Sequence, residues 1–450
     1  MRWRPVTAFC SLLLCCRTGS QSTHGTALPA TVIPPDAGLR RAWDLNGIIG
    51  TGQSLSVGAQ GLPLRATAPS FNNLKLDLGT RAFPATDAAS GRLSLVPLRE
   101  PIRPLARRYP APYPRNIQGE TPHTCMATEI TRLLLDATQQ RGDYVTVHTV
   151  VGESGQALSV IAKDAKRSGA TGFAYERSLF EVQAIARLAK AANRSFGIGA
   201  LVLTHGETDA ENPDYERGLL ALWQSYNQDL PRITGQQKPI PLFLTQQSSC
   251  PTDDGSLAHS ALAALRASRA SGSGIVCVGP RYQYSYDGDG VHLDSLGYDR
   301  LGEKYGQAYF ESVLRGRPWQ PLSALAARRE GAAIRVDFHV PVPPLVWDDE
   351  LPPPQPSRVE WSTARGFELS TRERPLPITS VEISADSVLI RVPSAPSGPL
   401  LVRYAATAAA APRLHGTHRW GQLRDSDPFV GATTRTAQPN YAVTFELEVP

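Results

Sequence analysis

The sequence predicts an α/β fold, in which a parallel sheet is covered by helices, followed by an antiparallel β-sandwich. Between residues 44 and 312, apolar runs typical of buried strands alternate with runs of helical period. After residue 318, apolar residues recur at every second position and helical patterns are nearly absent. We therefore expect one domain over residues 36–318 and a second over residues 319–450.

Strands and helices are expected to alternate along the first domain. Strands are predicted where aliphatic and β-branched residues cluster, at 45–49, 144–151, 198–203, 240–245 and 274–278. Helices are predicted where apolar residues recur every three or four positions, at 123–138, 180–192, 215–230, 258–270 and 295–314. Ligand sites of open parallel sheets form at the edge where the strands end, so the residues that follow each strand are of most interest.

The second domain is predicted from alternating patterns of five short strands. They are expected at 333–340, 380–384, 388–392, 400–404 and 441–449. The proline-rich stretch 341–356 is expected to be a surface loop, because proline cannot donate a hydrogen bond to a central strand.

The overall composition is that of a mildly basic protein with enough apolar residues for real cores. Of the 450 residues 41% are hydrophobic, and 46 Lys and Arg against 41 Asp and Glu give a net charge of +5. These charges are scattered, with no long basic run, which argues against a nucleic-acid partner.

The N-terminus has a basic start and a short apolar core, which is typical of a secretory signal. The apolar stretch is too short to span a bilayer. Cys15 or Cys16, after three leucines, resembles the lipid-attachment site of a bacterial lipoprotein, although the small residue that usually precedes such a cysteine is absent. We expect residues 1–35 to be a leader and flexible tether, and the protein to be secreted or anchored by lipid in the cell envelope.

Three further cysteines follow the leader, namely Cys125, Cys250 and Cys277, so at least one lacks a partner within the chain. None has the spacing of a zinc site, and no metal site is predicted. Cys250 follows one predicted strand and Cys277 lies in the next. A disulfide between them and a pair of free buried thiols both remain open.

Ser54 is the candidate nucleophile. It follows the first predicted strand and a tight turn that contains Gly50 and Gly52. A serine at the start of a turn or helix has a free backbone N–H that can point at a substrate, as a nucleophile with an oxyanion site requires. The alternative is that Ser54 only caps a helix.

His292 and Asp289 are the candidate base and its orienting carboxylate. The motif Asp-x-x-His on a loop before a helix lets the carboxylate hold one ring nitrogen, while the other takes the serine proton. Asp287 and Asp294 lie close by, so local composition alone does not select the orienting residue. The alternative is a polar loop that caps the final helix.

His205 follows the strand at 198–203 and could donate an N–H to an oxyanion. Glu207 and Asp209 could hydrogen-bond to it or lock the loop that carries it. The alternative is a histidine satisfied by neighbouring groups, with a structural role only.

Together these motifs resemble the SGNH (GDSL-like) hydrolase superfamily, and within it the sialate O-acetylesterases and related carbohydrate acetylesterases. The resemblance rests on Gly52-Gln53-Ser54, on the block 205–209, on Asp289-Gly-Val-His292, and on 153–158 as a glycine loop. It covers about residues 44–312 and implies a flavodoxin-like three-layer α/β/α sheet. His205 stands where these relatives have glutamine.

The resemblance implies a serine esterase that removes acetyl or other small acyl groups from carbohydrates without a cofactor. The implied catalytic residues are Ser54, His292 and Asp289; the backbone N–H groups of Ser54 and Gly155 and the side chain of His205 would form the oxyanion hole, with Gln53, Glu207 and Asp209 in support. A lipid or thioester hydrolase would use the same triad, but 7% aromatic residues and no apolar lid argue against it. A non-catalytic carbohydrate-binding protein is the other alternative.

Overall fold

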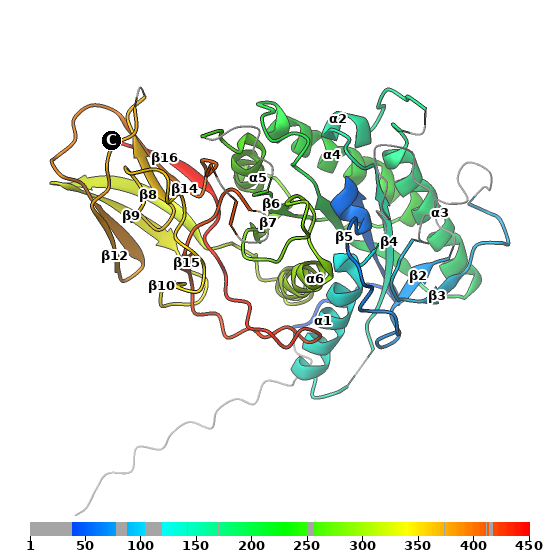
Figure 1. The fold of residues 1–450 in the computed structure, drawn as a ribbon. Coiled ribbons are helices and arrows are strands. Elements are labelled where there is room, and N and C mark those ends of the chain that lie inside the picture. The colour runs from blue at the N-terminus through cyan, green and yellow to red at the C-terminus, as the bar shows by residue number, and fades with distance from the viewer. Residues whose placement is uncertain are drawn as a thin grey trace, which may run out of the picture.

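The structure, a computed structural model, describes residues 38–77, 88–103, 119–141, 143–169, 171–249, 255–372, 374–410, 412–413 and 417–450. A seven-stranded sheet lies at its centre, in the order β3-β2-β4-β1-β5-β6-β7 (Figure 1). All neighbours are parallel except β3, which is antiparallel to β2. The strands are β1 (Leu45–Gly52), β2 (Leu74–Leu76), β3 (Leu95–Pro97), β4 (Val145–Gly152), β5 (Phe196–Thr204), β6 (Leu242–Gln246) and β7 (Ile275–Pro280).

Helices cover both faces of this sheet because its strands are apolar on both sides. One apolar cluster joins one face to α3 (Ala174–Ala191), α4 (Tyr215–Thr234) and α5 (His259–Arg269). The other joins the opposite face to α1 (Pro122–Ala137) and to α6 (Ser295–Tyr309), which continues as a π-helical turn, η3 (Phe310–Leu314). The predicted α/β architecture is thereby confirmed.

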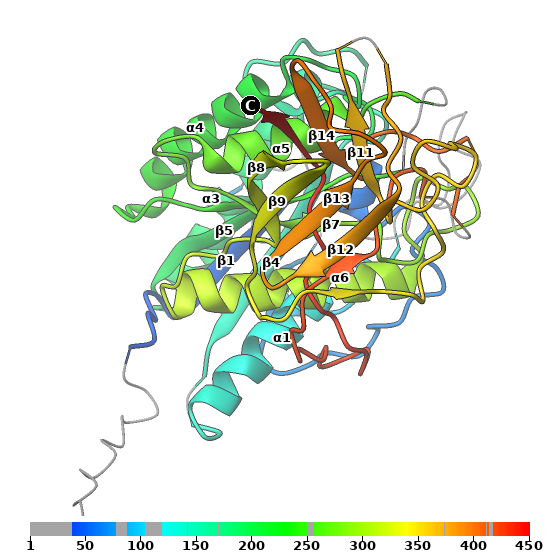
Figure 2. The same ribbon diagram turned by 90° about the vertical axis from the view of Figure 1, so that its left-hand side faces the viewer.

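Residues 319–450, here called the β-module, contain antiparallel sheets (Figure 2). Phe338 of one sheet packs edge-on against Phe367 and Phe445 of another, with ring centroids 6.4 and 5.9 Å apart. This is the face-to-face packing of a β-sandwich. The strands are β8 (Ser323–Glu330), β9 (Ala333–His339), β12 (Ser380–Ser384) and β13 (Ser387–Arg391) in one sheet, β11 (Phe367–Ser370), β14 (Leu400–Tyr404) and β16 (Phe445–Val449) in the second, and β10 (Val346–Trp347) with β15 (Leu423–Arg424) in a third.

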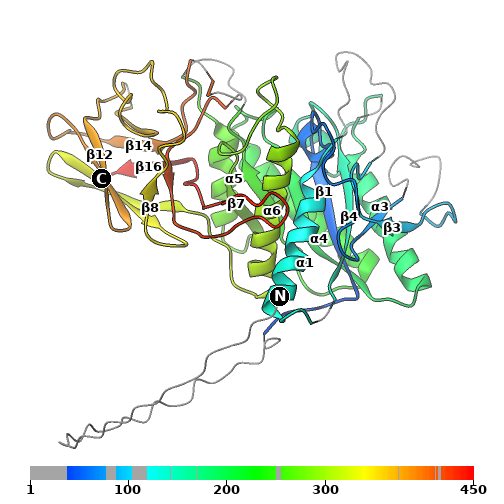
Figure 3. The ribbon, with the colours of Figure 1, turned by 60° about the horizontal axis from the view of Figure 1, so that its bottom comes forward.

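The β-module is joined to the α/β part by polar contacts and by a shared core. The Gln246 side chain, at the end of β6, accepts from Thr444 N and donates to Thr444 O, at 2.7 and 2.9 Å. The chain after β15 runs past α6 toward α1 (Figure 3), where Glu303 of α6 accepts from Thr434 N at 2.7 Å. One apolar cluster includes residues of both parts. The division into two domains at 318/319 therefore stays a prediction.

Several sequence-based expectations fall on residues outside the described ranges. The leader and tether at 1–35, with Cys15 and Cys16, are among them, as is Cys250. Cys277 is a buried free thiol, which agrees with the alternative of unpaired cysteines. Among the described helices, none combines the length and apolar character that crossing a bilayer requires.

The centre of the sheet brings three strand ends together. Gly52, the last residue of β1, pairs with Gly152 at the end of β4 and with Thr204 at the end of β5. Gly52 has φ +142°, and a Cβ there would lie 2.1 Å from the carbonyl oxygen of Thr204. Only glycine fits this approach. The loops that follow these three strands therefore start side by side.

A buried pair of histidines lies between β4, β1 and α1. Thr146 donates its hydroxyl proton to Asn73, so its oxygen accepts from Nε2 of His148 at 2.9 Å. Nδ1 of His148 then accepts from Nδ1 of His123 at 3.0 Å, which fixes both neutral tautomers. Burial lowers the pKa of His123 to about 3, and burial together with the neighbouring His123 lowers the pKa of His148. Both rings are therefore neutral in the folded protein.

These histidines should make the protein acid-sensitive. Their stabilising contribution is complete above the unfolded-state pKa of about 6.5 and is lost as the pH falls toward the lowered folded-state pKa, which is about 3 for His123. Each adds a slope approaching about 1.4 kcal/mol per pH unit in this window. We expect His123→Gln to flatten the fall in unfolding free energy between pH 6.5 and 4.5, measured by urea titration. The exposed His259→Gln is the control, and equal slopes in all three proteins would contradict the expectation.

Candidate active site

Ser54 lies at the point where β1 turns into a short 3-10 helix, η1 (Ser54–Val57). The turn is held because Gln53 N donates to Thr204 O at 3.2 Å and the Ser56 hydroxyl donates to Gln53 O at 2.7 Å. Ser54 is 6% exposed and is therefore almost completely buried. The direction of the chain at this turn follows from the close approach of Gly52 in β1 to the carbonyl oxygen of Thr204 in β5.

His292 lies beside Ser54 although 238 residues separate them. Nε2 of the His292 ring is 2.6 Å from the Ser54 hydroxyl oxygen, and Nδ1 is 2.6 Å from Oδ2 of Asp289. The second oxygen of Asp289 accepts from the backbone N–H groups of His292 and Val291, both at 2.9 Å. The structure thus brings together the serine, the histidine and the carboxylate that the motifs single out.

The structure also separates the roles of the three neighbouring aspartates. Asp294 caps α6, accepting from Gly297 N at 2.7 Å, and Asp287 uses its backbone N–H to bind the carbonyl of His292. Of these three aspartates, only Asp289 hydrogen-bonds to the His292 ring. The helix-capping alternative therefore applies to Asp294.

The hydrogen bonds among Ser54, His292 and Asp289 favour an ionised Asp289 carboxylate. Burial of Asp289 opposes its ionisation, but hydrogen bonds from the His292 ring and backbone outweigh burial and lower the pKa of Asp289 to about 2. The carboxylate is therefore charged at neutral pH and accepts a proton-bearing Nδ1. Nε2 of His292 is left to accept the proton of Ser54.

The backbone N–H groups of Ser54 and Gly155 have no partner within the described residues. The loop that carries Gly155 begins beside the nucleophile turn, because Glu153 N donates to Gly52 O at 3.0 Å. Gly155 is exposed and has φ +68°. Free backbone donors of this kind are what an oxyanion site needs.

His205 does not offer a donor to such a site, which corrects the role predicted for it. Its Nε2 donates to the carbonyl of Gln156 and its Nδ1 accepts from the Tyr215 hydroxyl, both at 3.0 Å. Burial lowers the pKa of His205, so the ring is neutral and has a single N–H, already used. His205 instead holds the loop that presents Gly155. The sequence could not show this, because a histidine and the glutamine of the resembling family can both donate an N–H from this position.

Asp209 and Gln53 fasten the same loops from other directions. Oδ2 of Asp209 accepts from Leu158 N at 2.6 Å, which ties the loop after β5 to the loop after β4. The side-chain oxygen of Gln53 accepts from the Thr208 hydroxyl at 3.2 Å. Both residues therefore contact neighbouring loops, and their supporting roles stay predictions.

Glu207 forms a buried ion pair with Arg281, the first residue after β7. Arg281 is fully buried and Glu207 is 5% exposed. Nε of Arg281 also donates to Gln246 O, at the end of β6, at 3.4 Å. The pair therefore connects the loops that follow β5, β6 and β7, the last of which carries Asp289 and His292. Sequence analysis missed Arg281; its position directly after the last strand was the only available signal.

A different group of acidic residues could be considered for a metal. Ligand atoms of Glu120, Cys125 and Asp299 all lie within 4.8 Å of one another. These carboxylates already have partners, because Nε of Arg65 lies 2.5 Å from Asp299 and the Arg65 backbone N–H donates to Glu120 at 2.6 Å. The cluster reads as a buried structural network.

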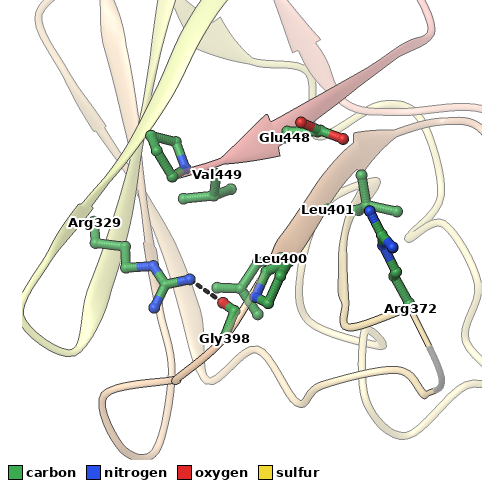
Figure 4. A pocket seen from close by; sticks show the side chains of 9 residues that line it. Arg329, Arg372, Gly398, Leu400, Leu401, Glu448 and Val449 are labelled. Carbon is green, nitrogen blue, oxygen red and sulfur yellow. Dashed lines mark hydrogen bonds between the residues drawn. The ribbon is translucent and has the colours of Figure 1, made fainter.

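A cavity of about 670 Å³ lies in the β-module and is lined by residues of β8, β14 and β16 (Figure 4). Arg329 projects toward it and donates to the carbonyl of Gly398. The nine lining residues include Arg372 and Glu448 but no serine, cysteine, threonine or histidine. It therefore offers no hydroxyl or thiol nucleophile among its lining residues.

Comparison with solved structures shows the same fold in a carbohydrate acetylesterase from Xanthomonas citri. The TM-score is 0.53 at 13% sequence identity, over 89% of this chain and 80% of the other. A protein from Arabidopsis thaliana aligns with 60% of this chain and 99% of its own at 18% identity, with a TM-score of 0.41. A carbohydrate acetylesterase from Sinorhizobium meliloti aligns with 58% of this chain and 97% of its own at 13% identity, with a TM-score of 0.30. No protein-family model and no curated protein matches the sequence.

Removal of one partner of the buried ion pair should be costly. Glu207→Gln leaves the Arg281 charge buried without its counter-charge, and we expect a loss of about 3–5 kcal/mol in unfolding free energy, measured by urea titration. The double variant Glu207→Leu/Arg281→Met should recover at least half of that loss, because an apolar pair removes both charges. The exposed Glu350→Gln serves as control. A single variant as stable as wild type would exclude the structural role of the pair.

His205→Ala should lower the stability of the folded protein. The substitution leaves Gln156 O and the Tyr215 hydroxyl without their partners, which costs about 1–3 kcal/mol. His205→Gln should restore part of this, because its amide can donate to the same carbonyl. The melting temperatures of the two variants are compared with that of Tyr215→Phe, which removes only the hydrogen bond between Tyr215 and His205. An alanine variant with an unchanged melting temperature would argue against the loop-holding role.

Proposed function

We propose that this chain is a serine esterase that removes acetyl or other small acyl groups from carbohydrate hydroxyls. The observation that carries the proposal is the continuous chain from Ser54 through His292 to Asp289, with 2.6 Å at each step. The flavodoxin-like, SGNH-type arrangement belongs to the same proposal. It is supported by the order of the five longer parallel strands, which is 2-1-3-4-5 when they are numbered along the chain.

The proposed reaction has two halves. His292 takes the Ser54 proton at Nε2 while the serine oxygen attacks the ester carbonyl, and the backbone N–H groups of Ser54 and Gly155 stabilise the oxyanion. Collapse breaks the bond to the sugar oxygen, which receives the proton from His292. Water, deprotonated by His292, then attacks the acyl-serine, and release of the acid returns the proton to Ser54. Asp289 stays ionised throughout and stabilises the protonated ring.

A carbohydrate ester is supported as substrate by the openness of the site. The side chains of His292 and Asp289 are 17% and 35% exposed, so the triad is not enclosed by an apolar channel. A large polar substrate can then present one acyl group without being enclosed. The fold shared with a carbohydrate acetylesterase agrees with this choice.

We also propose export through the leader at residues 1–35, with lipid attachment at Cys15 or Cys16 as one form of it. The basic start and short apolar core support this proposal. Intact mass of the protein isolated from the envelope of its own cells tests it, because cleavage and acylation both change the mass.

Ser54→Ala should abolish the proposed activity. Loss of the nucleophile should reduce kcat by about 10⁴-fold or more, measured as acetate release from a panel of acetylated glycans. The exposed Ser357→Ala should match wild type, and a metal chelator should leave the rate unchanged. Retention of a tenth of the wild-type rate in Ser54→Ala would be incompatible with a serine nucleophile.

A further inference from the structure

One segment of the β-module lies against the loops at the active-site edge of the sheet. This segment, made of residues 406–410, 412–413 and 417–419 and here called the strap, pairs with the loop after β6. Ala408 N donates to Ser256 O at 2.9 Å, and Gly255 N donates to Ala408 O at 3.2 Å. Nη2 of Arg419 binds the Ser256 hydroxyl at 2.9 Å. The strap is therefore fixed to the α/β part.

Arg413 of the strap reaches the next loop, between β7 and α6. Its Nη2 donates to the carbonyl of Tyr282 at 2.6 Å and to that of Tyr284 at 3.0 Å. The guanidinium is itself oriented, because Nε donates to the Thr417 hydroxyl at 3.0 Å. One planar cation thus holds two carbonyls of the loop that carries Asp289 and His292.

The far part of this loop is organised mainly within itself. Asp287 N donates to His292 O at 2.8 Å, and an isolated bridge joins Tyr286 to Leu293. These bonds shape the loop but do not fix where it lies relative to Ser54. That position depends on contacts with other elements. The Glu207–Arg281 ion pair and a hydrogen bond of 3.2 Å between the Tyr286 and Ser248 hydroxyls hold the loop to the α/β part. From the β-module, Ala442 O accepts from the Tyr282 hydroxyl at 2.7 Å and Arg413 binds the first residues of the loop.

We propose that Arg413 is a positioning residue, which holds the His292 loop at hydrogen-bonding distance from Ser54 and so makes catalysis depend on the β-module. This inference rests on the proposed esterase function. The triad is sensitive to such control, because a misplacement of about 1 Å can cost about 10²-fold in rate. Arg413 acts through the loop, since its contacts are with the loop backbone and with Thr417.

The test compares Arg413→Met, which removes the donors but keeps a long side chain, with Arg413→Lys, which keeps a cationic donor. Arg391→Met, on the exposed face of β13, is the matched control, since Arg391 pairs only with Glu382 within the described residues. For each protein, kcat and KM are measured with 4-nitrophenyl acetate, and hydrogen–deuterium exchange is followed in peptides covering residues 282–294. Should Arg413→Met fail to fold, Arg413→Gln takes its place.

We expect Arg413→Met to lower kcat by about 10- to 100-fold with KM changed less than about 3-fold, since the geometry and not the binding surface is altered. Hydrogen–deuterium exchange should become faster in peptides covering residues 282–294. Arg413→Lys should recover part of the lost kcat and part of the slower exchange of wild type. Arg391→Met should resemble wild type.

Two outcomes separate failure of this inference from failure of the proposed function. An active wild type with unchanged kcat and unchanged loop exchange in Arg413→Met would overturn the role of Arg413. An inactive wild type, whose Ser54 also resists a serine-directed organophosphate, would overturn the esterase proposal. Quicker loop exchange in Arg413→Met would in that case still establish that the strap holds the loop.

Discussion

The buried ion pair between Glu207 and Arg281 is the constraint on which the arrangement of the site depends. A charge pair enclosed by protein tolerates little separation, because each partner alone would face a large desolvation cost. Glu207 lies in the loop after β5 and Arg281 begins the loop after β7, while Arg281 also reaches the end of β6. Three loops are thereby fixed relative to one another, and the groups that would perform chemistry occupy their outer parts.

Two separate sets of contacts build the site, one made by the triad side chains and one that holds the backbone of the surrounding loops. Ser54, His292 and Asp289 form one linear chain of proton donors and acceptors, while a separate set of buried contacts holds the loop that presents Gly155. The second set includes the His205 ring, which has a single N–H, and the Asp209 carboxylate, which accepts from Leu158 N. Asp289 is the carboxylate that hydrogen-bonds directly to the His292 ring.

Sequence reasoning was most successful where one physical signal dominated. All ten predicted elements of the α/β part have counterparts, because buried strands and amphipathic helices differ in period. The strands β2 and β3 were missed because each has only three residues. The convergence of Ser54 with His292 followed from their motifs, whereas Arg281, Arg413 and Tyr215 carry no local pattern. Their roles arise from tertiary contacts alone, as does the true role of His205.

The late position of the strap in the chain has a consequence for biosynthesis. Domains generally fold from the N-terminus as the ribosome releases them, and distant contacts close last. The His292 loop is bound by Arg413 and by the carbonyl of Ala442, and β6 is joined to Thr444 just before the final strand. A nascent chain therefore holds its serine in a nearly complete sheet before the loop that would activate it is secured. The contacts with Arg413, Ala442 and Thr444 form only after these residues have been made, well after the strands of the sheet.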